Sequence, residues 1–342
     1  MVKLETAPDR ESRPPRFAFV LQPEFPINAF ILATEALRIA NQNSGRQIFD
    51  WIVLTEKGQA VRASNGMWIT PESQIGDAQQ ADFVLVFEGN LPTQRNSARL
   101  LAVLRAALRF GSTVIGIDTG AFALAQAGLA ESREVTLHWE AAPAFAERFP
   151  ELPVKDCLYT IDGTAGFCAG GIAALDLMLE LIGRLRGRAL ADEVANALVH
   201  TPREGERKQR PAEVSGESAP SFQRQLITLL EQNLDFPLSP RELAVSLGIS
   251  LRTLERQCAL HFGQTPARLY LKIRLQAARN LLFYEELSVK SISNACGFSY
   301  PSVFTRAFTQ QFGQSPRRFR IALRANQERT LRPELQRLAK AG

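Results

Sequence analysis

Cysteine is scarce in this sequence, and its spacing narrows the class of protein. Only four of the 342 residues are cysteines, and none lies in a CxxC pair or beside a histidine. This spacing excludes a disulfide framework and a cysteine-ligated metal centre. We therefore expect no metal and no cofactor, and we expect Cys157 and Cys168 to be small buried residues.

Long apolar runs are absent as well. Residues 1–16 are charged, contain prolines and lack the apolar core of a secretory leader, so we expect them to be flexible. The longest apolar helical pattern, 171–182, is interrupted by Asp176 and Glu180. These features argue against secretion and against a membrane span, and the chain is expected in the reducing cytoplasm.

Charge is divided unevenly along the chain. Residues 1–210 carry 22 Lys and Arg against 25 Asp and Glu, a net charge of −3, whereas residues 211–342 carry 18 against 10, a net charge of +8. A basic excess in one part predicts a polyanionic partner for that part, most often nucleic acid. A solvated basic surface is the alternative interpretation.

Between residues 17 and 200, short apolar runs alternate with amphipathic helical patterns. Runs without polar alternation are typical of strands buried on both faces, as in a parallel sheet. The expected strands are 17–21, 49–54, 83–87 and 112–117, and the expected helices include 27–41 and 93–109. This order predicts a layered α/β domain.

The rest of the chain has a different composition. Residues 201–220 contain almost no bulky apolar side chain and are expected to form a solvated linker. Strand patterns are absent beyond it, so an all-α domain is expected over 221–325, followed by a fraying tail over 326–342.

An internal repeat lies in the basic part. Residues 243–248 match 292–297 at an offset of 49, and the FGQTP segment at 262–266 recurs as FGQSP at 312–316, at an offset of 50. Each copy is therefore expected to form one supersecondary unit.

The first copy has the local features of a helix-turn-helix. Ser239, Pro240 and Glu242 predict a capping box at a helix start. Gly248 supplies a left-handed residue that ends this helix, and Ser250 can cap the next one.

The second helix of such a unit enters the major groove, where arginine pairs with guanine and glutamate accepts a hydrogen bond from cytosine. The expected DNA-binding positions are Ser250, Arg252, Glu255 and Arg256 in the first copy and Pro301, Ser302, Thr305 and Arg306 in the second. A phosphate contact or an internal salt bridge is the alternative for Arg256 and Arg306. The helix expected over 300–312 is expected to bury Val303, Phe304 and Phe308.

Further basic residues lie between and after the two copies. They are Arg268, Lys272, Arg274 and Arg279, on a helix expected over 266–283, and Arg317, Arg318 and Arg320. Their density suits phosphate neutralisation.

Residues 222–324 resemble the DNA-binding domain of the AraC/XylS family. The signature is ISNACGFSYPSVFTRAFTQQFGQSPRRFR, over 292–320, and only Ser293 departs from the usual alanine. The resemblance implies two helix-turn-helix units, joined by a long helix, that bind successive major-groove turns of double-stranded DNA.

In the front domain, the segment STVIGIDTGAFALAQAGLA, 112–130, has the pattern of a strand, a tight turn and a helix. It places Asp118 at the sheet edge where α/β folds bind ligands. Residues 17–200 resemble the PfpI/ThiJ and class I glutamine-amidotransferase-like superfamily, which implies a flavodoxin-like layered parallel sheet. Its enzymes have a cysteine at this elbow. A carboxylate is a poor acyl acceptor, so His138 has no nucleophile to activate, and neither catalytic residues nor enzyme activity are expected.

Four motifs also resemble the GlxA-like regulators, in which such a domain precedes an AraC-type tail: EALRIANQ at 35–42, DTGAFALAQAGL at 118–129, HWE at 138–140 and CAGGIAALDLML at 168–179. The resemblance implies a transcriptional activator that senses a small nitrogenous metabolite. It also implies RNA polymerase as a partner and a homodimer as the assembly.

Anionic and aromatic side chains suit an ammonium or guanidinium group. The expected ligand-binding residues are Phe25, Glu88, Asn90, Asp118, Thr119, His138 and Trp139. Core or capping roles are the alternatives for Glu88, His138 and Trp139. For the whole chain, the alternatives are a PfpI-like hydrolase or lyase with a DNA-binding tail, and a constitutive DNA-binding protein whose front domain only dimerises.

Overall fold

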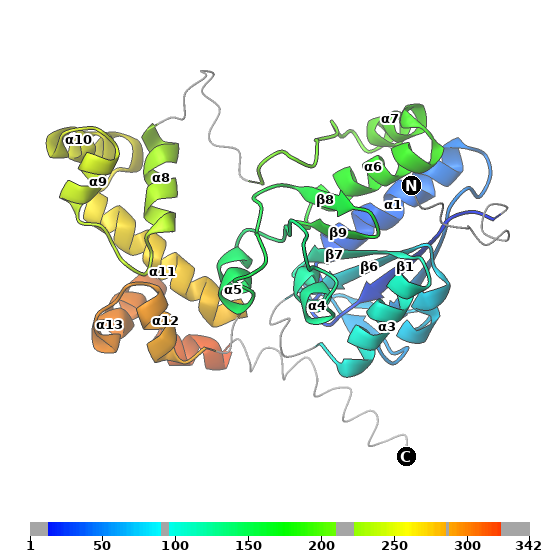
Figure 1. Cartoon of the computed structure of the whole chain (residues 1–342), viewed down its shortest axis with the longest axis horizontal. Coiled ribbons are helices and arrows are strands. Elements are labelled where there is room, and N and C mark those ends of the chain that lie inside the picture. Colours follow the sequence, from blue (N-terminus) through cyan, green and yellow to red (C-terminus); the bar gives the residue numbers. More distant parts are fainter. Residues whose placement is uncertain (1–12, 90–95, 210–221, 285–286, 323–342) are drawn as a thin grey trace, which may run out of the picture. The chain divides into compact units, whose positions relative to one another are not determined.

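The computed structural model describes residues 13–89, 96–209, 222–284 and 287–322 (Figure 1). The chain divides into two compact units, Met1–Gln209 and Arg210–Gly342. The expectations for residues 1–12, for Asn90, for 210–220 and for the tail at 326–342 lie outside the described residues. Within the described ranges, no helix is both long enough and apolar enough to span a membrane.

A seven-stranded sheet forms the centre of the front unit. Its order is β5-β2-β1-β6-β7-β9-β8, and every pairing is parallel except that of β8 with β9. A two-stranded antiparallel sheet, β3 with β4, accompanies it. The strands are β1 Arg16–Leu21, β2 Asp50–Thr55, β3 Val61–Arg62, β4 Trp68–Ile69, β5 Ser73–Gln74, β6 Phe83–Glu88, β7 Thr113–Asp118, β8 Tyr159–Asp162 and β9 Ala165–Cys168.

Helices cover both faces of this sheet (Figure 1). They are α1 Ile27–Asn43, the 3₁₀ helix η1 Ile75–Gln80, α3 Ala98–Arg109, α4 Gly120–Gln126, α5 Ala142–Arg148, α6 Ala173–Arg186 and α7 Arg188–Ala197. The predicted α/β, flavodoxin-like fold class is confirmed. The helix expected from residue 93 instead begins at Ala98, because the Ser97 side chain accepts a hydrogen bond from the Leu100 N–H and caps it there.

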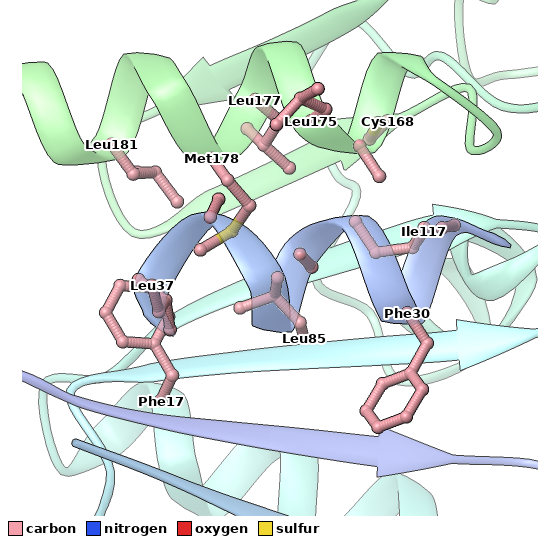
Figure 2. Packing of buried hydrophobic residues seen from close by; sticks show 14 of the residues in the cluster. Phe17, Phe30, Leu37, Leu85, Ile117, Cys168, Leu175, Leu177, Met178 and Leu181 are labelled. Carbon is pink, nitrogen blue, oxygen red and sulfur yellow. The ribbon is translucent and has the colours of Figure 1, made fainter. Parts of the chain in front are cut away.

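The core follows from the alternation of side chains along each strand. On β1, Phe17, Phe19 and Leu21 enter one buried cluster together with residues of α1, α6 and α7. Figure 2 shows two contacts of this cluster: Met178 of α6 points towards α1, and Leu37 of α1 lies near Phe17 of β1. This cluster fixes α1 and α6 over one face of the sheet, with the strand ends at its edge.

The unit begins earlier and ends later than expected. Arg13, expected in the flexible N-terminus, donates to the Asp82 carboxylate at 3.1 Å, and the Arg16 N–H donates to the same carboxylate at 2.8 Å. At the other end, Arg203 donates to the buried Asp176 carboxylate at 2.6 Å, and the Gly205 carbonyl accepts from the Leu158 N–H. Residues 203–209 were expected within the linker, whereas these contacts place them in the front unit.

The rear unit is all-α. Its helices are α8 Phe222–Gln232, α9 Pro240–Ser246, α10 Leu251–Phe262, α11 Pro266–Tyr284, α12 Val289–Ala295 and α13 Pro301–Phe312. The capping box at Ser239 is present, and Ser250 caps α10 through the Thr253 N–H. Gly248 and Gly297 have φ of 67° and 69° and end the first helix of each unit, as predicted.

Candidate ligand site and DNA-binding surface

Asp118 stands at a sharp elbow between β7 and α4. Its φ is +60°, which is rare for a residue other than glycine. The turn is tight because the chain passes very close to its neighbours: a Cβ at Gly120 would lie 2.4 Å from the Val86 carbonyl oxygen, and one at Gly170 would lie 2.9 Å from Asp118 Cβ. These two glycines allow the backbone to hold the carboxylate at the carboxyl edge of the sheet.

The environment of Asp118 disfavours its charged form. Burial raises its pKa to about 7, the charge of Glu140 adds to this, and a hydrogen bond from the Thr119 backbone acts in the opposite direction. Perturbed carboxyl groups of this kind cluster at functional sites. The elbow is therefore the strongest candidate for a binding site in the front unit.

Two expected ligand-binding residues adjoin Asp118. Glu88, the last residue of β6, is the register partner of Asp118 on β7 and is fully buried. Thr119 is also fully buried, and its hydroxyl donates to the Gly89 carbonyl at 2.6 Å. Thr119 therefore ties the end of β6 to the elbow.

The segment 136–140 lies within electrostatic range of the elbow. The charge of Glu140 affects both Asp118 and His138, and burial lowers the pKa of His138. The rings of His138 and Trp139 are half-buried, with centroids 5.8 Å apart.

Gln209 holds this segment in place, and no motif in the sequence indicates this role. The Gln209 side chain accepts from the Trp139 N–H at 3.0 Å and donates to the Leu137 carbonyl at 2.8 Å and the Thr136 hydroxyl at 3.2 Å. Gln209 is the last described residue of the front unit. The end of this unit is thus bonded to the segment that carries His138 and Trp139.

Phe25 belongs to the core cluster of the front unit. It is fully buried and packs edge-on against Phe30 at 5.8 Å. The loop after β1 directs this ring into the core cluster, and a contact of Phe25 with a ligand stays a prediction.

The front unit also has a polar hollow, of about 690 Å³, away from the elbow. Charged residues of β8, α6, α7 and segment 202–206 line it, and many of them pair with one another, as Arg184 does with Glu180 at 2.7 Å. The elbow is the better candidate for a ligand site, since its carboxylate has a raised pKa and lies at the strand ends where α/β sheets bind ligands.

Cys157 and Cys168 are buried, as predicted, and all four cysteines are buried thiols that form no disulfide. Burial raises the pKa of the Cys168 thiol to about 12 and also raises that of Cys157. Thiols with raised pKa values are poor nucleophiles at neutral pH.

In the rear unit, the exposed face of α10 carries charged side chains. Arg252, Glu255 and Arg256 are exposed, and none of their side chains forms a hydrogen bond or an ion pair with another described residue. The internal salt bridge weighed for Arg256 is thus not formed within the described ranges. These side chains are available to a base edge or a phosphate.

The exposed face of α13 is less charged. Pro301, Ser302, Thr305 and Arg306 line a shallow, mainly apolar hollow together with Thr309 and Gln310. The Arg306 side chain has no ion pair or hydrogen bond with any residue in 222–284 or 287–322. Val303, expected to be buried, is 51% exposed, while Phe304 and Phe308 are fully buried.

Ser250 has a structural role, since its hydroxyl accepts a hydrogen bond from the Thr253 N–H and caps α10, and its contact with DNA stays a prediction. Arg317 and Arg318, after the second copy, are both exposed.

Arg274 differs from the expectation of a phosphate contact. Its guanidinium donates to the Cys296 carbonyl at 2.7 Å and the Gly297 carbonyl at 2.6 Å, and it lies 4.1 Å from the centroid of the Phe298 ring. Arg274 therefore joins α11 to the turn of the second unit.

An α/β domain with an elbow at its strand ends, followed by two helix-turn-helix units with free basic side chains, defines a DNA-binding protein of two parts. Residues 30–155 match the DJ-1/PfpI family, and residues 243–322 match the helix-turn-helix domain. The HTH-type transcriptional regulator CdhR of Pseudomonas aeruginosa is 38% identical over 310 residues, which cover 90% of this chain and 92% of that protein.

The HTH-type transcriptional regulator GlxA of Rhizobium meliloti is 34% identical over 306 residues, 88% of this chain and 94% of that protein. A crystal structure of an AraC family transcriptional regulator from Pseudomonas putida matches with a TM-score of 0.50 and 26% identity, and covers 54% of this chain and all of that one. The chain belongs to the AraC-type transcriptional regulators of the GlxA-like group, with a DJ-1/PfpI domain in front of the DNA-binding domain.

Proposed function

We propose that this regulator is an activator whose front unit binds the cationic group of a small nitrogenous metabolite at Asp118 and does not catalyse a reaction. Asp118 occupies the elbow where the enzymes of the superfamily carry their thiol. The bound metabolite changes how the rear unit engages its promoter. A homodimer and recruitment of RNA polymerase are part of this proposal.

The observation that carries the proposal is the pair of acidic residues at the strand ends. Glu88 and Asp118 are register partners on adjacent parallel strands. A cation placed against Asp118 stabilises its charged form, which burial disfavours. The aromatic ring of Trp139 supplies a second feature that suits an ammonium or guanidinium group.

Calorimetric titration of the full chain tests the ligand class. The probes are arginine, glycine betaine, carnitine and sarcosine, each added at pH 8, where Asp118 is ionised. We expect at least one to bind and Asp118→Asn to weaken it at least tenfold. The matched control is Asp162→Asn, an exposed aspartate that lines the polar hollow. Binding that survives Asp118→Asn, or no binding by any probe, contradicts the proposal.

A reporter fused to the bound promoter separates the alternatives. Output that rises with the metabolite supports an activator, whereas a fall indicates a repressor. Output that never changes indicates a constitutive DNA-binding protein. Sedimentation of the full chain measures the homodimer directly.

A further inference from the structure

The two recognition helices present different chemistry at equivalent positions. In the alignment of the two copies at an offset of 50, three positions of α10 correspond to three of α13: Arg252 to Ser302, Glu255 to Thr305 and Arg256 to Arg306. Three charges on one helix therefore correspond to one charge on the other. Since both sets lie on exposed faces, this contrast is a property of the DNA-facing surface.

On α10, all three charged side chains are free of partners within the described residues, although Arg252 and Glu255 are three residues apart on one helix. Such a pair often forms a surface ion pair. Here the side chains are available to base edges. Arginine matches the two acceptors of guanine, and glutamate accepts from the cytosine amino group.

On α13, apolar surface replaces most of this charge. Val303 is 51% exposed and Tyr300, which precedes the helix, is 67% exposed. Val303 takes the place that Thr253 has on α10, where the threonine hydroxyl is engaged with Ser250 at 2.8 Å. A valine that a helix of this kind leaves exposed has no role in the core.

The hollow on α13 adds to the apolar surface. It is shallow, and Pro301 and Thr305 lie on its wall. The Thr309 hydroxyl donates to the Thr305 carbonyl, so it is held by its own helix. The base feature that apolar groups recognise in the major groove is the C5-methyl group of thymine.

We propose that α10 reads a subsite with G·C pairs through Arg252, Glu255 and Arg256, and that α13 reads a thymine-containing subsite in which Val303 contacts a thymine methyl group. Arg306 supplies the single charged contact of the second subsite. The bound DNA is therefore asymmetric in base composition, even though the protein uses one motif twice.

Selection of binding sites by the full chain from random double-stranded DNA is the first test. We expect two separated blocks, one with fixed G·C pairs and one with fixed thymines. Glu255→Gln should change one position of the first block from cytosine towards adenine, which glutamine pairs with. Two blocks of the same composition overturn the asymmetry.

Replacement of thymine by deoxyuridine is the second test, since it removes only the methyl group. One such change in the second block should weaken binding by about fourfold, because the complex loses the burial of one methyl group, which contributes about 0.8 kcal/mol. Val303→Ala should weaken binding to the thymine site by a similar factor and make the protein indifferent to the replacement.

Val245→Ala is the matched control, because Val245 is a 79% exposed valine on α9, outside both recognition helices. It should bind as the parent does and stay sensitive to deoxyuridine. Because Val303 is exposed, its replacement by alanine should leave the fold intact, and circular dichroism of the variant checks the fold. If deoxyuridine in the second block has no effect, or if Val303→Ala remains sensitive to it, the assignment of Val303 is wrong.

Discussion

Ser293 is a buried polar residue at a packing contact in the second helix-turn-helix unit. It is fully buried, and its hydroxyl has no hydrogen-bond partner among the residues that the structure describes. Ala244 occupies the equivalent position of the first unit. The two residues accept equivalent backbone hydrogen bonds: the Ala244 carbonyl from the Ile249 N–H, and the Ser293 carbonyl from the Phe298 N–H. The geometry calls for a small residue, and the hydroxyl adds only a desolvation cost.

Ser293→Ala should therefore stabilise the rear unit. Removing an unpaired buried hydroxyl gains about 1 kcal/mol, and the melting temperature of a unit of this size should rise by about 4–8 °C. Differential scanning calorimetry of the full chain measures the shift. The reverse change, Ala244→Ser, should lower the melting temperature. A melting temperature that falls in Ser293→Ala would show that the hydroxyl has a partner.

Asp118 gives the front unit a characteristic pH dependence. Its pKa in the folded chain is about 7, whereas an aspartate in an unfolded chain has a pKa of about 4. Between these values the folded chain keeps a proton that the unfolded chain has released. The stability contributed by this group is therefore fully present below about pH 4 and is lost as the pH rises towards 7.

Asp118→Asn should remove this loss of stability with rising pH. The free energy of unfolding of the variant should rise relative to that of the parent between about pH 4 and pH 7, and the difference should stay constant above that range. Urea unfolding across this range measures it. Glu140→Gln should move the transition to lower pH, because the Glu140 charge raises the pKa of Asp118. Parallel curves for the parent and Asp118→Asn would contradict the assignment.

At the scale of elements, the end of the front unit is bonded to the segment 136–139. Gln209→Ala removes the acceptor of the Trp139 N–H and the donor to the Leu137 carbonyl. Hydrogen exchange of the Trp139 amide should accelerate about fivefold, since the loss of one well-placed hydrogen bond costs about 1 kcal/mol. The measurement is amide exchange of the full chain.

Two further variants separate the side-chain roles. Lys208→Ala is the matched control, because Lys208 is exposed and its side chain has no partner within 13–89 or 96–209. Gln209→Glu keeps the acceptor for Trp139 and loses the donor to Leu137, so its exchange rate should be intermediate. Unchanged exchange in Gln209→Ala would show that other contacts hold the segment.

Elements whose causes lie within a few residues were predictable from the sequence. The caps at Ser239 and Ser250 depend only on the next three residues, and both are present. Asp118 could be placed because a parallel strand fixes where its carboxyl end lies. The repeat identified both helix-turn-helix units, because the glycine in the turn of the first unit recurs at the equivalent position of the second.

Contacts between distant segments were not predictable. The bond from Gln209 to Trp139 joins residues 70 apart, and Arg274 reaches carbonyl groups 22 and 23 residues away. No periodicity in the sequence encodes such pairs. Val303 illustrates a different limit: Phe304 and Phe308 share one stripe of α13, while the preceding residue lies about 100° around the helix. The apolar character of Val303 alone therefore did not show whether its side chain points into the core or towards solvent.

For the whole molecule, the opposite charges of the two parts correspond to two compact units. Residues 1–210 have a net charge of −3 and 211–342 a net charge of +8, and the structural division falls between Gln209 and Arg210. The basic excess therefore belongs to the helix-turn-helix unit. Its free side chains divide into those on the recognition helices and those after the second unit, and these two sets should affect DNA binding differently.

Arg318→Ala should weaken binding to all DNA sequences by a similar factor, because a phosphate contact carries no sequence information. The slope of log K against log salt concentration should become shallower by about 0.9, which corresponds to one lost phosphate contact. Arg256→Ala should instead lower the preference for the selected site over random DNA by about 5- to 150-fold. Titrations of both variants at several salt concentrations, with the exposed front-unit residue Arg109→Ala as the control, measure the two effects. If Arg318→Ala changed discrimination and Arg256→Ala changed only the salt slope, the roles of the two arginines would be reversed.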